Sequence, residues 1–117
     1  MSTLKVNTLE EATAGGATFF TAKVWCNWEQ VGTHSILGSG NVSSLTDGGT
    51  GITTTNFSSS LSTSAYSMGL ASGQSSNDPY RYLGLYTGKT TSSVQTATIH
   101  DNVARYDAEY NSITVVL

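Results

Sequence analysis

Aromatic and polar side chains come together around the single proline of this chain. Tyr80, Arg81 and Tyr82 follow a polar loop that contains Asn77 and Asp78. The apolar face of a sugar ring stacks on tyrosine, while asparagine, aspartate and arginine bond its hydroxyls. These five residues therefore form a candidate binding site for a sugar. In the competing interpretation, which we favour, the tyrosines pack in the core or at an interface and the loop only connects two strands.

The histidines and acidic residues form no recognisable catalytic or metal pattern. His34 and His100 are isolated, and no Gly-x-Ser-x-Gly elbow accompanies them, so each is interpreted as a hydrogen-bonded or solvated histidine at a strand end. Asp101, Asp107 and Glu109 carry oxygen ligands suited to calcium but lack the spacing of a calcium loop, and we interpret them as solvated charges. The sequence therefore predicts a protein that is not an enzyme and has no metal or cofactor.

The one cysteine and the glycine cluster both have structural explanations. Cys26 lies on an apolar strand face, which predicts a small core residue rather than a reactive thiol. A single cysteine also excludes an intrachain disulfide and a zinc cluster built from thiolates. No lysine follows the segment 48–51, and no helix is expected to begin there, so its glycines predict a turn rather than a phosphate site.

Length and charge restrict the partners. The chain has 117 residues, of which 11% are charged, and its net charge is -3, so we expect one domain without a basic surface for nucleic acid or anionic membranes. No signal peptide and no apolar run of membrane-spanning length is evident. We therefore expect neither secretion by the general route nor membrane insertion.

Hydroxyl side chains dominate the composition. Serine and threonine together account for 35 residues, whereas leucine, isoleucine and valine are sparse. A chain with few aliphatic side chains can offset its loss of conformational entropy by burying further surface between identical copies, usually with closed symmetry. The composition therefore predicts a homo-oligomer.

The first 17 residues differ from the rest. They are mostly polar and end in Ala14-Gly15-Gly16-Ala17, which is typical of an arm followed by a flexible joint. Leu4 and Val6 alternate with polar residues, which favours a short strand that docks on a neighbouring sheet or another protein over a free tail. We therefore divide the chain into a docking arm, 1–17, and a domain, 18–117.

Residues 18–117 have the two-residue period of β-strands. In the first strand, Val24, Cys26 and Trp28 share a face that we expect to be core, whereas Phe19 and Trp25 lie on the opposite face, which suits an oligomer interface. A glycine-rich turn joins two strands within 41–57, and a serine-rich segment, a loop or one helical turn, follows it. Further strands are expected at 33–37, where Gly38-Ser39-Gly40 ends the run, and at 65–71, 80–89, 91–99, 104–106 and 112–117. Short strands at this spacing predict an all-β fold, an antiparallel β-sandwich or jelly-roll-like domain.

The order of several segments resembles a known family. An AKVWCNW strand at 22–28, a hairpin with a glycine-rich turn at 41–57 and an Ala-Tyr pair at 65–66 follow one another. In this order they are similar to the small β-domain of bacteriophage tail-fibre and related virion proteins. The segments 2–8 and 113–117 likewise resemble the opening and closing segments of short marine-phage fibre proteins.

This resemblance implies a location in the phage particle, assembled in the host cytoplasm. It implies a homotrimer, because fibre proteins are commonly trimers, with the arm bound to other virion proteins. The expected function is that of a short tail-fibre or fibre-tip subunit that contributes to host-surface adhesion, with the five residues around the proline as the candidate receptor-binding site for a host-surface glycan. The alternatives are a capsid decoration or head-fibre protein of the same fold and, more distantly, a glycan-cleaving tip.

Overall fold

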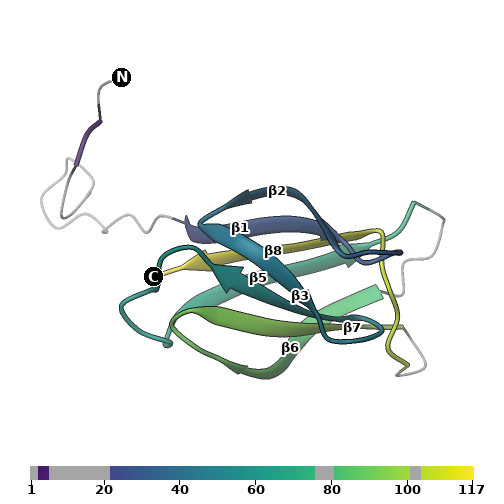
Figure 1. The fold of residues 1–117 in the computed structure, drawn as a ribbon. Helices are drawn as coiled ribbons and strands as arrows, with labels where there is room; N and C mark the ends of the chain where they lie inside the picture. The colour runs from purple at the N-terminus through teal and green to yellow at the C-terminus, as the bar shows by residue number, and fades with distance from the viewer. Residues whose placement is uncertain (1–2, 6–21, 76–80, 101–103) are drawn as a thin grey trace, which may run out of the picture.

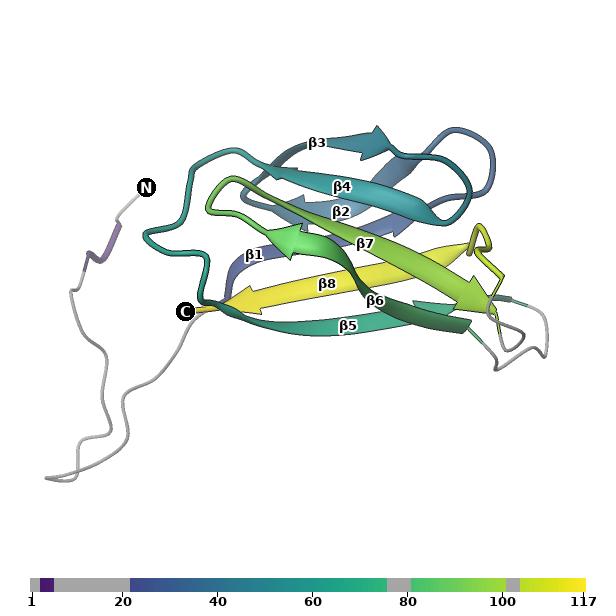
Figure 2. The ribbon, with the colours of Figure 1, turned by 90° about the horizontal axis from the view of Figure 1, so that it is seen from below.

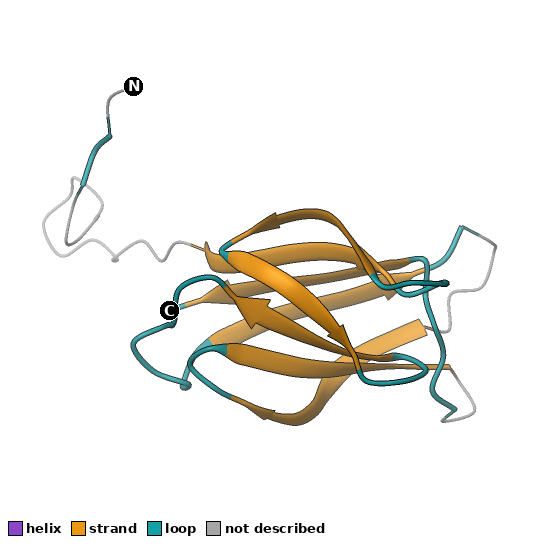
Figure 3. Ribbon diagram, viewed as in Figure 1, coloured by secondary structure: helices purple, strands orange, loops and turns teal. Residues whose placement is uncertain are grey.

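The computed structural model describes residues 3–5, 22–75, 81–100 and 104–117 (Figure 1). These residues form strands and loops, without a helix (Figure 3). The strands of the described residues are β1 (Ala22–Glu29), β2 (Ser35–Gly40), β3 (Val42–Asp47), β4 (Ile52–Phe57), β5 (Ser67–Gly73), β6 (Arg81–Lys89), β7 (Ser93–His100) and β8 (Tyr110–Val116).

The strands form two four-stranded sheets. The first sheet has the order β2-β1-β8-β5 and the second has the order β3-β4-β7-β6. All neighbouring strands are antiparallel, and the two sheets lie face to face (Figure 2). Three hairpins stay within one sheet, and the other connections between these strands cross from sheet to sheet. The predicted all-β antiparallel sandwich is confirmed.

A single residue, Asn41, takes the chain from the first sheet to the second. Its φ of 57° is left-handed, a region that asparagine tolerates better than most residues. Its side-chain amide donates to the carbonyls of Lys23 and Ser59, both at 3.1 Å, and its side-chain oxygen accepts from the Ser59 N–H at 2.8 Å. The Asn41 side chain therefore holds the corner by hydrogen bonds to β1, at Lys23, and to the loop after β4, at Ser59.

The predicted hairpin of β3 and β4 is confirmed, with a turn that needs its glycines. Gly49 and Gly51 have positive φ values of 110° and 71°, and the Asp47 carboxylate accepts a hydrogen bond from the Gly49 N–H at 2.8 Å. A Cβ on Gly51 would lie 2.6 Å from the carbonyl oxygen of Thr98. Gly51 is therefore required both by its backbone angle and by the close approach of the second sheet's β7.

The core lies between the sheets and draws different side chains from each. As predicted, Val24, Cys26 and Trp28 are fully buried, and Ile113 and Val115 of β8 join them. Burial of each large apolar side chain contributes about 1.5–3 kcal/mol. The second sheet adds Phe57 and Val94 to this cluster and also buries four threonines completely, namely Thr53, Thr55, Thr96 and Thr98.

The prediction that Gly38-Ser39-Gly40 ends its strand is wrong, because β2 continues to Gly40. Gly40 is paired with Trp25 of β1, and a Cβ on Gly40 would lie 2.3 Å from the Trp25 indole nitrogen. A Cβ on Gly38 would also touch the Trp25 ring, at 3.4 Å. The glycines thus make room for the indole across the strand pair rather than forming a turn.

Candidate functional site

Of the five predicted receptor residues, the structure describes Arg81 and Tyr82, at the start of β6. Asn77, Asp78 and Tyr80 lie outside the described residues. Tyr82 is 54% exposed, whereas Arg81 is only 7% exposed. Successive residues of a strand point to opposite faces of the sheet, so Arg81 and Tyr82 do not form one exposed site.

Arg81 is buried against the rings of Tyr106, which is 43% exposed, and His100, which is partly buried. Its guanidinium carbon is 3.9 Å from the ring centroid of Tyr106, and the ring of His100, its partner in β7, is 5.9 Å from the same tyrosine ring. A stacked guanidinium of this kind anchors the segment that leads into β8. Arg81 therefore serves packing, which corrects the expectation that it bonds sugar hydroxyls beside Tyr82.

Tyr82 belongs to a pocket on the second sheet, here called the tyrosine pocket. Its volume is about 270 Å³, and it is lined by Tyr82, Leu83, Gly84, Leu85, Tyr86, Ala97 and Ile99. Tyr86 is 43% exposed, and Gly84 stands between the two tyrosines on β6. The strand register pairs Tyr82 with Ile99 and Gly84 with Ala97. Two exposed aromatic rings thus flank a position without a side chain.

Arg105 lies beside this pocket. It forms a backbone bridge with Ile99, its guanidinium carbon is 4.8 Å from the Tyr86 ring centroid, and its Nη2 donates to the Tyr86 hydroxyl at 2.7 Å. Sequence analysis missed Gly84, Tyr86 and Arg105 as site residues. Tyr86 was recognised only as part of a strand, and nothing in the sequence brings Arg105 next to it.

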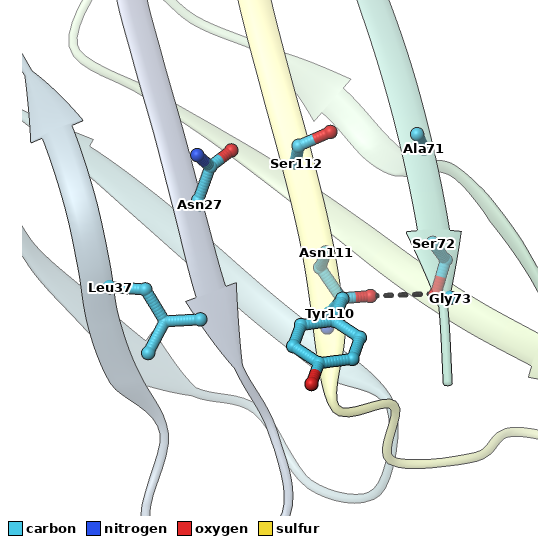
Figure 4. A pocket seen from close by; sticks show the side chains of 8 residues that line it. All are labelled: Asn27, Leu37, Ala71, Ser72, Gly73, Tyr110, Asn111 and Ser112. Carbon is cyan, nitrogen blue, oxygen red and sulfur yellow. Dashed lines mark hydrogen bonds between the residues drawn. The ribbon is translucent and has the colours of Figure 1, made fainter. Parts of the chain in front are cut away.

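A second pocket lies on the first sheet (Figure 4). Its volume is about 350 Å³, and it is lined by Asn27, Leu37, Ala71, Ser72, Gly73, Tyr110, Asn111 and Ser112. Leu37 and Tyr110 are 56% and 53% exposed. The Asn111 side chain is buried, where its oxygen accepts bonds from Ser72 at 2.9 Å and from Thr98 at 3.0 Å. The exposed part of this pocket is therefore largely apolar.

The predicted interface and arm residues are only partly described. Val6 and Phe19 lie outside the described residues. Leu4 is 86% exposed and Trp25 is 42% exposed. Trp25 therefore lies on the outer face of the first sheet as expected, and Asn27, two residues further along the same face of β1, lines the pocket of Figure 4.

His34 takes part in a buried hydrogen-bonded network. Its Nε2 is 3.6 Å from the Asp47 carboxylate and its Nδ1 is 3.2 Å from the Thr53 hydroxyl. That hydroxyl also accepts the N–H groups of Trp28 at 3.2 Å and Gln30 at 3.0 Å, which leaves its own proton for His34. Because Thr53 is fully buried and saturated with partners, the Asp-His-Thr order does not present a nucleophile.

Asp107 and Glu109, which we interpreted as solvated charges, accept hydrogen bonds from backbone N–H groups. Asp107 accepts the Gly51 N–H at 2.7 Å, and Glu109 accepts the Ser75 N–H at 3.0 Å, while Asp101 lies outside the described residues. Within the described part of the chain, no three His, Cys, Asp or Glu residues group in a way that could hold a metal.

Cys26 is the buried core residue that its strand position predicts. It is a free thiol with no exposed surface, and desolvation by burial raises its pKa to about 11. The thiolate, the reactive form, is therefore scarce at neutral pH.

Across the residues that the structure describes, no helix is long and apolar enough to cross a membrane.

Comparison with known proteins finds no matching family model, no matching curated protein and no matching solved structure.

Proposed function

We propose that this chain is a non-enzymatic structural protein of a bacteriophage particle, a short trimeric tail-fibre or fibre-tip subunit. Its N-terminal arm, 1–17, attaches to another virion protein, and its sandwich domain contributes to adhesion on the host surface. The order of the strand at 22–28, the hairpin at 41–57 and the closing strand at 113–117 supports this proposal through their resemblance to virion proteins.

The observation that carries the assembly is the outer face of the first sheet. Trp25, Leu37 and Tyr110 leave large apolar side chains half exposed there. The outward residues of β1 between Lys23 and Glu29, near the two ends of the strand, are uncharged, and so are the outward residues of β5 and β8. An exposed apolar face of this kind favours cover by another protein surface.

The same face carries large side chains along one edge and small side chains along the other. The large side chains lie on β1, β2 and β8, whereas the outward positions of β5 are Ser67, Gly69, Ala71 and Gly73. Nothing lies within 4 Å of a Cβ built on Gly69 or Gly73, and neither has a positive φ, so packing within the chain does not require these glycines. Identical copies can place the large side chains of one against the small side chains of the next, and this head-to-tail contact closes a ring of three when the rotation between copies is threefold.

Light scattering on the purified full chain tests this assembly. The expected mass is three times that of the chain, and Gly69→Arg is expected to reduce it to that of a single chain, because the new charge would enter the interface. Gly88→Arg is the matched control on the second sheet, since Gly88 also has open space around it. A wild-type protein that remains monomeric at high concentration contradicts the proposal.

Location in the particle separates the fibre from a capsid decoration protein. A reconstruction of the whole particle is expected to place a few copies at the tail. Hundreds of copies over the capsid would contradict the fibre and support the decoration protein. Incubation with host polysaccharide is expected to release no new reducing ends, and their release would contradict the non-enzymatic assignment.

A further inference from the structure

We propose that the tyrosine pocket binds a sugar ring that carries a carboxylate. In this arrangement the sugar ring stacks on Tyr82 and Tyr86 above Gly84, and Arg105 bonds the sugar carboxylate. The inference rests on the adhesive function proposed above and deepens it, because it names the ligand class and the surface that binds it.

The two tyrosines supply the stacking surface. Tyr82 and Tyr86 are 54% and 43% exposed, and both line the pocket with the apolar side chains of Ala97 and Ile99 behind them. The C–H face of a pyranose packs on such rings, whereas its hydroxyls stay in reach of polar groups and water.

Gly84 forms the floor between the tyrosines. A Cβ built at this position meets no atom within 4 Å, and its φ is not positive. Neither packing nor backbone geometry within the described residues therefore requires glycine, although glycine weakens a strand interior. A group that approaches the strand from outside explains it, because any side chain here would fill the space between the two rings.

Arg105 makes the pocket selective for an anion. It stacks beside Tyr86 and donates one N–H to that hydroxyl, so its side chain is positioned before a ligand arrives. A guanidinium has five N–H donors in a planar fork, which suits two parallel bonds to a carboxylate. None of the described residues that line the pocket is acidic, so no carboxylate of the lining competes for the cation.

Size and position fit one sugar unit at the end or side of a glycan. The volume of about 270 Å³ lies just below the range of about 300–1,000 Å³ that is usual for ligand pockets. The pocket belongs to β6 and β7, in the lower layer of Figure 1, while the proposed self-association face belongs to the other layer. Assembly through the first sheet therefore leaves the pocket accessible.

Saturation-transfer NMR with the full chain tests the proposal. The probes are the methyl glycosides of glucuronate and galacturonate, with those of glucose and galactose as neutral partners of the same ring shape. Each uronate is expected to bind at least tenfold more tightly than its neutral partner and to receive saturation at its C–H face. If no uronate binds, or if neutral sugars bind equally well, the proposal is wrong.

Two variants connect the binding to the pocket. Gly84→Val is expected to abolish binding by filling the floor while keeping the fold, because valine favours strands. Gly88→Val, on the same strand but outside the pocket lining, is the matched control and should bind as the wild type does. Arg105→Gln is expected to remove the tenfold preference for uronates. Unchanged uronate binding in Gly84→Val would overturn the proposal.

The test is independent of assembly and of location in the particle. A monomer that binds uronates through Gly84 and Arg105 would refute the proposed trimer and support the pocket. A trimer located at the tail that binds no uronate would refute the pocket and leave the fibre function standing.

Discussion

The two sheets of this sandwich contribute to one core in different ways. The first sheet inserts mainly apolar side chains such as Trp28 and Ile113, whereas the second, beside Phe57 and Val94, buries four threonines, namely Thr53, Thr55, Thr96 and Thr98. An apolar side chain needs only contact, but a buried hydroxyl must also find a hydrogen-bond partner. The first sheet is therefore stabilised chiefly by burial, and the second depends on specific bonds as well.

The outer faces differ in the same way. On the first sheet, Trp25, Leu37 and Tyr110 stand among small side chains. On the β3 and β4 half of the second sheet, polar side chains bond to one another, as when the Asn56 amide donates to Thr46 at 3.0 Å and to Ser44 at 3.2 Å. The first sheet therefore presents an apolar surface that another protein can cover, whereas the β3 and β4 half of the second sheet presents a polar surface suited to water.

The largest expected effect comes from the apolar sheet. Ile113→Ala is expected to lower the free energy of unfolding by about 4 kcal/mol, because it leaves a cavity in a fully buried cluster. Thr96→Ala, its counterpart on the second sheet, loses fewer atoms and one bond at 3.4 Å, and about 1–2 kcal/mol is expected. Urea denaturation of both variants measures the difference, and equal losses would contradict the contrast between the sheets.

The second largest effect tests whether hydroxyl partners matter. Thr53→Val keeps the shape of the side chain but removes the acceptor of the Trp28 and Gln30 N–H groups. Leaving buried donors unsatisfied is expected to cost about 3 kcal/mol. Urea denaturation gives the loss, and Thr53→Ser, which retains the hydroxyl, is the matched control. A Thr53→Val protein as stable as the wild type would show that these bonds do not hold the second sheet.

Substitutions of Asn41, where the chain passes from β2 to β3, are expected to lower the free energy of unfolding by less. Asn41→Ala loses three side-chain bonds and places alanine at a left-handed φ, which together should cost about 2 kcal/mol. Asn41→Gly restores the backbone freedom but not the bonds, so thermal unfolding of both variants separates the two causes. Full recovery in Asn41→Gly would assign the whole loss to the backbone.

The smallest effect has the opposite sign. Thr55 is fully buried, and its hydroxyl has no hydrogen-bond partner among the described residues. Thr55→Val removes this polar group at constant shape and is expected to raise the free energy of unfolding by about 1 kcal/mol. Calorimetry measures the change, with Thr53→Val as the paired variant. Destabilisation by Thr55→Val would reveal a partner for the hydroxyl and would weaken the distinction between these two threonines.

Much of the fold could be predicted from local patterns. The alternation of Val24, Cys26 and Trp28, the turn before Ile52 and the serine-rich loop after Phe57 are all confirmed. Each depends on a two-residue period or on glycine conformations, which short segments carry within themselves. The end of β2 was predicted wrongly because Gly38-Ser39-Gly40 resembles a turn, whereas its glycines accommodate an indole from another strand.

The candidate site was less accessible to prediction. Tyr82 could be proposed because an aromatic residue beside a polar loop is visible in the sequence. Arg81 was grouped with Tyr82 although strand alternation turns it to the opposite face, where it is buried against Tyr106. Arg105 and Gly84 acquire their roles only from the pairing of β7 with its neighbours.

The sequence alone determined an all-β chain, its principal hairpin and the apolar face of its first strand, because strand period and turn chemistry are local properties. Only the tertiary structure decided that four threonines of the second sheet are fully buried, that Trp25 lies over Gly40 and that Arg105 stacks on Tyr86. Each of these depends on pairing between distant segments, and the register of that pairing is set by the packing of the whole sandwich.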